Sequence, residues 1–220
     1  MFFSGKYKFL LMLIAIFLLA SGCSNKKSSV EKMYDVLENV VSKEKGFEEQ
    51  QEPLVSLEKK EKELYDKIIG LGMKEYDEIV KLSDEAIALA NQRQEHMEKE
   101  TKSMKESEKE FKKVTDIKDG LEDPALKKLA NELYVIMIER YKAHDDLYTE
   151  YSEALKDDKQ LYEMFKDKNL PLEDLEGQVN KLNDLYKKVF DTNEKFNKLT
   201  EQYNEKKLAF YKKAELNTNK

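Results

Sequence analysis

Apolar residues recur at helical spacing along most of the chain, in four segments of nearly equal length. They predict helices over residues 30–69, 74–118 and 124–167, and a fourth helix that begins after Pro171 and continues toward the C-terminus. One stripe of the third segment repeats every seven residues, at Tyr134, Tyr141, Tyr148, Leu155 and Tyr162. The pattern therefore predicts an all-α protein with coiled-coil-like packing between long helices.

Residues with strong preferences for helix ends mark the boundaries of these segments. Ser28 and Glu31 have the spacing of a capping box, so the first helix is expected to begin directly after Ser28. Gly70 is expected to end that helix. Asp123 followed by Pro124 is typical of a helix start, with aspartate as the cap and proline in the first turn.

The first segment also contains Gly46 and Pro53, which both disfavour a helix interior. We expect a kink or a short break near Pro53. If that break were severe, the chain would form a three-helix bundle with an extended arm instead.

The short connections between the segments make consecutive helices antiparallel neighbours. The sequence thus predicts one elongated up-down-up-down four-helix bundle over residues 30–220, with no second domain. An even number of helices places both chain ends, together with the turn at 119–123, at one end of the bundle. The turns at 70–73 and 168–172 form the opposite end, the distal tip.

The N-terminus has the organisation of an export leader. Lys6 and Lys8 precede an uninterrupted run of twelve apolar residues at 9–20. This run is too short to span about 30 Å of hydrocarbon as a helix, whereas its length suits a signal peptide. Residues 1–22 are therefore predicted to be a cleaved signal peptide.

The only cysteine of the chain lies three residues after the end of the apolar run. Ser21 and Gly22 are small enough for a peptidase to cut after them, and Cys23 then offers a thiol for a diacylglyceryl group. Ala20 stands at a position where leucine is commoner. We predict that Cys23 is the lipidated first residue of the mature chain, that residues 23–29 are a tether, and that this lipid is the only attached group, without further cofactor or metal.

Charge adds to this picture and disfavours one class of partner. The mature chain from residue 23 has 37 basic and 45 acidic residues, a formal charge of −8. Only Arg93 and Arg140 are arginines, and arginine is preferred for recognising phosphates and bases, so nucleic-acid binding is not expected. Basic residues do gather near both chain ends, where they either face anionic headgroups or form a solvated surface: Lys26, Lys27, Lys206, Lys207, Lys212 and Lys213.

The two histidines do not fit a di-metal bundle. Such sites need Glu-x-x-His pairs, but Arg93 and Tyr141 lie three residues before His96 and His144. We expect His96 on the surface. His144 falls on an apolar stripe, and we expect it to be buried and hydrogen-bonded near Tyr141, Tyr148 or Asp145, or else to respond to pH.

No G-x-S-x-G, P-loop, H-E-x-x-H or glycine-rich nucleotide motif occurs in the sequence. Paired carboxylates are too abundant to indicate glycoside hydrolysis, which also needs a substrate cleft. We therefore predict that the protein is not an enzyme.

The lipidation motif Ala20-Ser21-Gly22-Cys23, followed by a Lys- and Glu-rich helical chain with tyrosine heptads, resembles the YkyA-like family of cell-wall-binding lipoproteins of Bacillus and related bacteria. The resemblance extends from Cys23 to the C-terminus. It implies a Gram-positive envelope location and a four-helix bundle, and it provides no catalytic residues to transfer.

These observations lead to two main hypotheses and a weaker third. The first is a non-enzymatic, lipid-anchored protein on the outer face of the cytoplasmic membrane that binds or spaces cell-wall components. Its contacts would lie on lateral charged faces or at the distal tip, where four apolar residues either form a patch or cap the core: Leu71, Met73, Leu170 and Leu172.

The second hypothesis is a small-ligand or metal receptor with an internal cavity lined by polar seam residues, which otherwise fix helix register or face solvent: Gln94, Thr101, Glu108, Asn193 and Thr200. The third is an accessory subunit of a membrane protein complex.

Overall fold

The computed structural model describes residues 27–216, apart from the side chain of Met73. It confirms the four-helix bundle. Three of the long helices have 42 residues each, a length of about 63 Å. The elements follow in the order α2 (Ser29–Gly70), η1 (Met73–Glu75), α3 (Tyr76–Phe111), α4 (Val114–Lys118), α5 (Pro124–Phe165) and α6 (Leu172–Lys213).

The predicted helix starts form as expected, because side chains bond the backbone amides that the first turn leaves without partners. Ser28 Oγ accepts from the Glu31 amide at 3.2 Å, and Glu31 Oε2 accepts from the Ser28 amide at 2.7 Å. Asp123 Oδ1 accepts from the Ala125 amide at 2.7 Å, and Pro124 follows as the first residue of α5.

Of the two alternatives expected near Pro53, a kink or a short break, the break is wrong, since α2 is one continuous helix through this residue. Proline removes one i→i−4 hydrogen bond, and the carbonyl concerned belongs to Glu49, whose exposed position lets water replace the lost donor. The backbone hydrogen bonding of α2 is instead interrupted near Gly46, where the Ser103 side chain of α3 inserts between an amide and its usual carbonyl partner. Ser103 Oγ accepts from the Phe47 amide at 2.9 Å and donates to the Lys43 carbonyl at 2.6 Å.

The second predicted helix is divided where a single helix to residue 118 was expected. It ends at Phe111, and the short helix α4 follows after a turn at Lys112 and Lys113. The Lys113 amide bonds the Glu110 carbonyl at 3.2 Å, a tighter i→i−3 pattern. This turn keeps Phe111 and Val114 on the same side, and both are fully buried.

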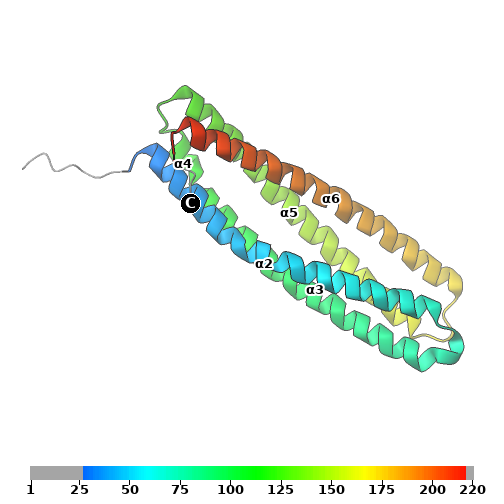
Figure 1. Ribbon diagram of the computed structural model, residues 1–220. Coiled ribbons are helices and arrows are strands. Elements are labelled where there is room, and N and C mark those ends of the chain that lie inside the picture. The colour runs from blue at the N-terminus through cyan, green and yellow to red at the C-terminus, as the bar shows by residue number, and fades with distance from the viewer. Residues whose placement is uncertain (1–26, 217–220) are drawn as a thin grey trace, which may run out of the picture.

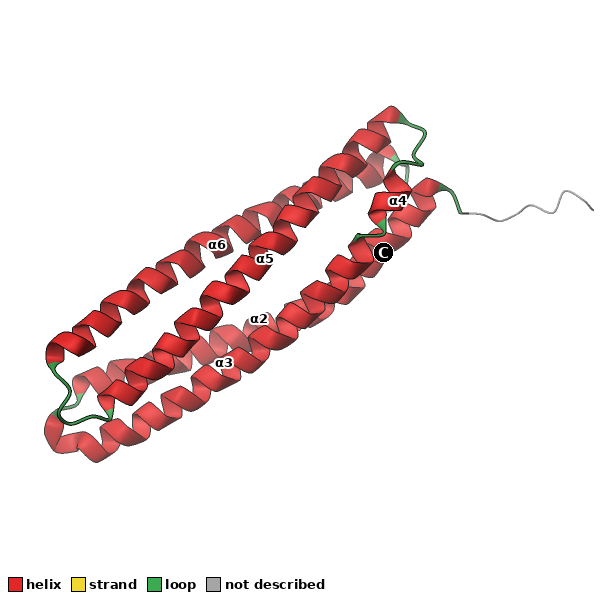
Figure 2. Cartoon of the chain, turned by 180° about the vertical axis from the view of Figure 1, so that it is seen from behind, coloured by secondary structure: helices red, strands yellow, loops and turns green. Residues whose placement is uncertain are grey.

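The helices run alternately up and down, and both ends of the described chain lie at one end of the bundle (Figure 1). There Tyr211 donates to Glu38 at 2.7 Å, which joins the end of α6 to the start of α2. The turns α2–α3 and α5–α6 lie together at the opposite end (Figure 2), where Lys166 bonds Asp84 at 2.9 Å. The alternative of a three-helix bundle with an arm is therefore wrong.

The apolar core is largest at the end that holds the chain ends. Leu37, Phe111, Leu133 and Phe210 are fully buried there. Two smaller clusters continue toward the distal tip, one around Leu155 and one on the other side of a polar layer. This polar layer interrupts the core at the candidate site.

Candidate functional site

Helix α2 packs on α3, α3 on α5 and α5 on α6. The fourth side of the bundle, between α2 and α6, contains two adjacent hollows of about 560 and 350 Å³. The two hollows share four lining residues, Glu58, Tyr151, Tyr186 and Val189. We therefore treat them as one groove, the α2–α6 groove. Each hollow lies within the usual volume range of ligand pockets.

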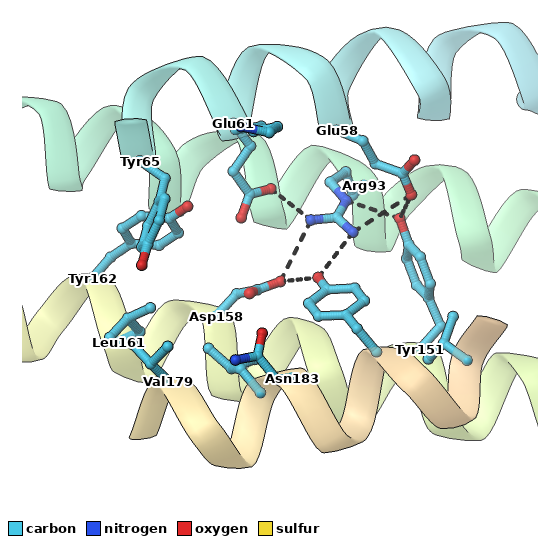
Figure 3. A pocket seen from close by; sticks show the side chains of 14 residues that line it. Glu58, Glu61, Tyr65, Arg93, Tyr151, Asp158, Leu161, Tyr162, Val179 and Asn183 are labelled. Carbon is cyan, nitrogen blue, oxygen red and sulfur yellow. Dashed lines mark hydrogen bonds and ion pairs between the residues drawn. The ribbon is translucent and has the colours of Figure 1, made fainter. Parts of the chain in front are cut away.

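Arg93 forms the polar floor of the groove, and its side chain is only 4% exposed (Figure 3). Each of its nitrogens has at least one partner, and these partners come from α2, α5 and α6. Nε donates to Tyr151 at 2.8 Å, Nη1 donates to Glu61 at 2.7 Å and Asp158 at 3.4 Å, and Nη2 donates to Tyr186 at 3.1 Å. Arg93 therefore ties all four long helices together at this level.

Further bonds connect the partners of Arg93 with each other. Tyr151 donates to Glu58 Oε1 at 2.6 Å, and Tyr186 donates to Asp158 Oδ2. Glu58 Oε1 also lies 3.5 Å from Arg93 Nη2. The network thus contains three carboxylates and one guanidinium, an excess of two negative charges when all are ionised.

Burial and this excess of negative charge shift the pKa values of two carboxyl groups in the network. Burial, and next the negative charge of Glu61, raise the pKa of Asp158 to about 7. Burial also raises the pKa of Glu61, against the opposing attraction of Arg93. At neutral pH the single positive charge of Arg93 therefore does not balance the negative charge of the ionised carboxyl groups in the groove.

The raised pKa of Asp158 predicts that stability falls as the pH rises toward neutrality. Between about pH 4 and pH 7 the folded protein keeps a proton that the unfolded chain has released, so this stabilisation is full near pH 4 and is lost as the pH rises through 7. The slope is at most about 1.4 kcal/mol per pH unit. Urea unfolding should show the wild type losing about 2 kcal/mol more than Asp158→Asn between pH 5 and pH 7.5. Parallel pH curves for the two proteins would contradict this.

The other arginine forms a second bridge nearer the chain ends. Arg140 Nη1 donates to Glu44 of α2 at 2.8 Å, and Nε donates to Thr200 of α6 at 2.8 Å. Its guanidinium also lies 4.7 Å from the Phe196 ring centre. Both arginines are thus buried links between α2 and α6, a role that was not predicted from the sequence.

His144 is buried, as predicted, but its partner is different from the residues considered. Its Nε2 lies 3.0 Å from Glu100 Oε1, and Gln51 donates to the other oxygen of Glu100 at 2.9 Å. Glu100 and Gln51 line the smaller hollow, so His144 lies directly behind it. His96 is half-buried beside Gln50 rather than on the open surface.

The lipidation and cleavage residues Ala20, Ser21, Gly22 and Cys23 lie outside the described residues, as does Lys26. The candidate basic residues that are described lie near the chain ends. Four of these form ion pairs with carboxylates: Lys27 with Asp35, Lys206 with Glu132, Lys207 with Glu38 and Lys213 with Asp123. The surface near the chain ends is therefore less basic than the sequence indicates. Lys212 is exposed.

The residues proposed for the distal tip do not share one environment. Leu71 packs against the distal core cluster, and Leu170 is half-buried. Leu172 is 68% exposed. The side chain of Met73 is outside the described part.

The proposed seam residues do not line a common cavity. Thr101 is buried, Gln94 and Glu108 are half-buried, and Thr200 is the partner of Arg140. Only Asn193 lines either hollow of the groove. Within residues 27–216 no three His, Cys, Asp or Glu side chains are placed to hold a metal ion.

Comparison with known proteins identifies the family of this bundle. Residues 28–213 match the model of the family YkyA, described as "Putative cell-wall binding lipoprotein". The chain belongs to this family, which confirms the resemblance drawn from the sequence. The names of the family and its members imply an envelope location with a membrane anchor, and none of the helices within residues 27–216 is long and apolar enough to cross a membrane.

A relative supports this assignment, and a solved structure shares the fold. The "Uncharacterized lipoprotein YkyA" of Bacillus subtilis is 36% identical over 200 residues, which cover 91% of this chain and 89% of the relative. A crystal structure of a conserved Staphylococcus aureus protein of unknown function has a TM-score of 0.73. It covers 86% of this chain and 98% of its own at 19% identity, a likeness that shows the fold alone.

Proposed function

We propose that this protein is a non-enzymatic lipoprotein, anchored through Cys23 to the outer face of the cytoplasmic membrane, which binds a cell-wall component in the α2–α6 groove. The observation that carries the proposal is the groove itself. It is a large hollow with buried polar groups and apolar walls on the side of the bundle where α2 and α6 face each other.

The position of the groove along the bundle suits this role. Both chain ends lie at one end (Figure 1), so a lipid at Cys23 would hold that end near the membrane. Glu58 lies 29 residues after the start of α2, or about 44 Å along the helix. The groove would then stand well above the headgroups, on the side of the wall.

The arrangement of the carboxylates supports binding over hydrolysis. Glu61 and Asp158 both bond Nη1 of Arg93, so the guanidinium occupies the space between them. A glycosidase needs two carboxyl groups that face each other across the sugar and its attacking water. Here a substrate would have to displace Arg93 from its buried bonds.

The cavity also favours the receptor hypothesis as a second candidate. The groove would then take a soluble fragment rather than the polymer, through residues other than the predicted seam. A binding experiment with intact sacculi and with their soluble digests distinguishes the two, because a receptor binds only the digests.

The test is co-sedimentation of the mature protein with purified sacculi. We expect saturable binding, which Val55→Ser/Phe190→Ser weakens about tenfold because it removes two exposed apolar side chains from the groove rim. Val55 and Phe190 are 65% and 60% exposed. The matched control is Val135→Ser/Leu208→Ser, which removes two exposed apolar side chains outside the groove. The absence of saturable binding by the wild type would refute the proposal.

A further inference from the structure

The charges of the α2–α6 groove indicate which chemical group it binds. Glu58, Glu61 and Asp158 face a single guanidinium, that of Arg93. Lys62 also lines the groove, but it is 73% exposed and bonds Asp66 at 2.6 Å. The floor of the groove is therefore acidic.

An anionic ligand would find at most one of the five N–H groups of Arg93 without a hydrogen bond, and Glu58 lies 3.5 Å from that nitrogen. The Arg93 nitrogens already donate to Tyr151, Glu61, Asp158 and Tyr186 (Figure 3). Breaking these bonds to admit a phosphate or carboxylate would leave buried carboxyl groups without their cation. The network thus disfavours anions.

A cationic ligand would meet a carboxylate that lines the larger hollow. Asp158 Oδ2 is occupied by Arg93 and Tyr186, whereas Oδ1 accepts no hydrogen bond from any of residues 27–216. Glu58 is nearer the surface, with 43% of its side chain exposed. Burial, and next the negative charge of Glu61, raise the pKa of Asp158, and a bound cation would favour the ionised carboxylate.

The walls of the groove suit an aliphatic chain beside that charge. Leu161, Val179 and Leu182 line the larger hollow together with the rings of Tyr65 and Tyr162. Aromatic ring faces attract ammonium groups, and apolar side chains pack against methylene groups. The hollow of about 560 Å³ is large enough for such a side chain and part of the backbone that carries it.

We infer that the α2–α6 groove binds an aliphatic primary ammonium group of a diamino-acid residue in the wall peptide, with the ammonium at Asp158, the negative charge of Glu58 nearer the surface, and the methylene chain along the tyrosine and leucine wall. This inference rests on the proposed function and names the wall group that is recognised. Because the ammonium is positive, it also agrees with the formal charge of −8 on the mature chain.

The test compares sacculi whose amines are intact with sacculi whose amines are acetylated by acetic anhydride. We expect wild-type binding to weaken at least about tenfold on acetylation. Equal binding to both preparations would overturn the inference while leaving wall binding intact. Binding to neither preparation would refute the proposed function itself.

Two further comparisons locate the amine and its receptor. Mild alkali removes amines that are held by ester bonds to anionic wall polymers. Retained binding after alkali therefore supports a peptide amine, whereas lost binding shows that the amine is not in the peptide and overturns the inference.

The variant Glu58→Gln/Asp158→Asn should bind intact and acetylated sacculi equally, with thermal melting confirming the fold. The matched control Glu52→Gln/Glu95→Gln removes two exposed charges outside the groove. If this control loses the difference as well, general charge attraction explains the binding and the inference fails.

Discussion

Replacing Arg93 with Met is expected to lower the free energy of unfolding at pH 7.5 by about 3–5 kcal/mol. The guanidinium bonds Glu61 and Asp158, whose side chains are 4% and 10% exposed. Without it, these carboxyl groups stay buried without a cation or must take up protons. The loss should therefore be smaller at pH 5, where protonation costs less. Urea unfolding at both pH values measures it.

Lys62→Met provides the matched control. Lys62 is a cation at the same level of the bundle, but it is 73% exposed and its ion pair with Asp66 is solvated. Such pairs contribute about 0–1 kcal/mol. If Arg93→Met costs no more than Lys62→Met, the buried network does not hold the helices together.

Replacing Cys23 with Ser is expected to abolish lipidation completely. A serine hydroxyl does not replace the thiol as acceptor of the diacylglyceryl group, and cleavage depends on that modification. Two acyl chains provide stable anchoring at about 0.8 kcal/mol for each buried methylene group. Mass spectrometry should find a mature chain that begins at lipidated Cys23 in the wild type, and an unmodified precursor that retains residues 1–22 in Cys23→Ser.

Ser24→Ala is the control for this experiment, because it changes the neighbouring residue and keeps the thiol. It should be lipidated and cleaved like the wild type. If the masses of the wild type and Cys23→Ser differ only by the exchange of one sulfur for one oxygen atom, the anchoring account is contradicted.

The fold could be predicted from the sequence because its determinants are local. The capping box of Ser28 and Glu31 and the start at Pro124 depend on residues within one helical turn. The break at Pro53 was expected wrongly, because the lost hydrogen bond was weighed without the packing that follows it, where Leu54 and Leu57 are buried. The division at Lys112 depends on tertiary packing, which spacing alone does not show.

The candidate site could not be predicted in the same way. Arg93 binds residues of α2, α5 and α6 that lie between 32 and 93 positions away in the chain. One pattern could have indicated it, because Arg93 lies three residues after Ala90 and four before Met97, on the inner stripe of its helix. An arginine at such a position needs buried acceptors. The abundance of carboxylates on the other helices hides which ones these are.

The account claims that the wall is bound in the α2–α6 groove and not at the distal tip. The most direct test measures the dissociation constant for sacculi with Val55→Ser/Phe190→Ser and with Ile69→Ser/Leu172→Ser, which removes exposed apolar side chains near the tip. We expect the groove variant to bind about tenfold more weakly than the wild type and the tip variant to bind like the wild type. Weakened binding by the tip variant, with the groove variant unchanged, would contradict the account.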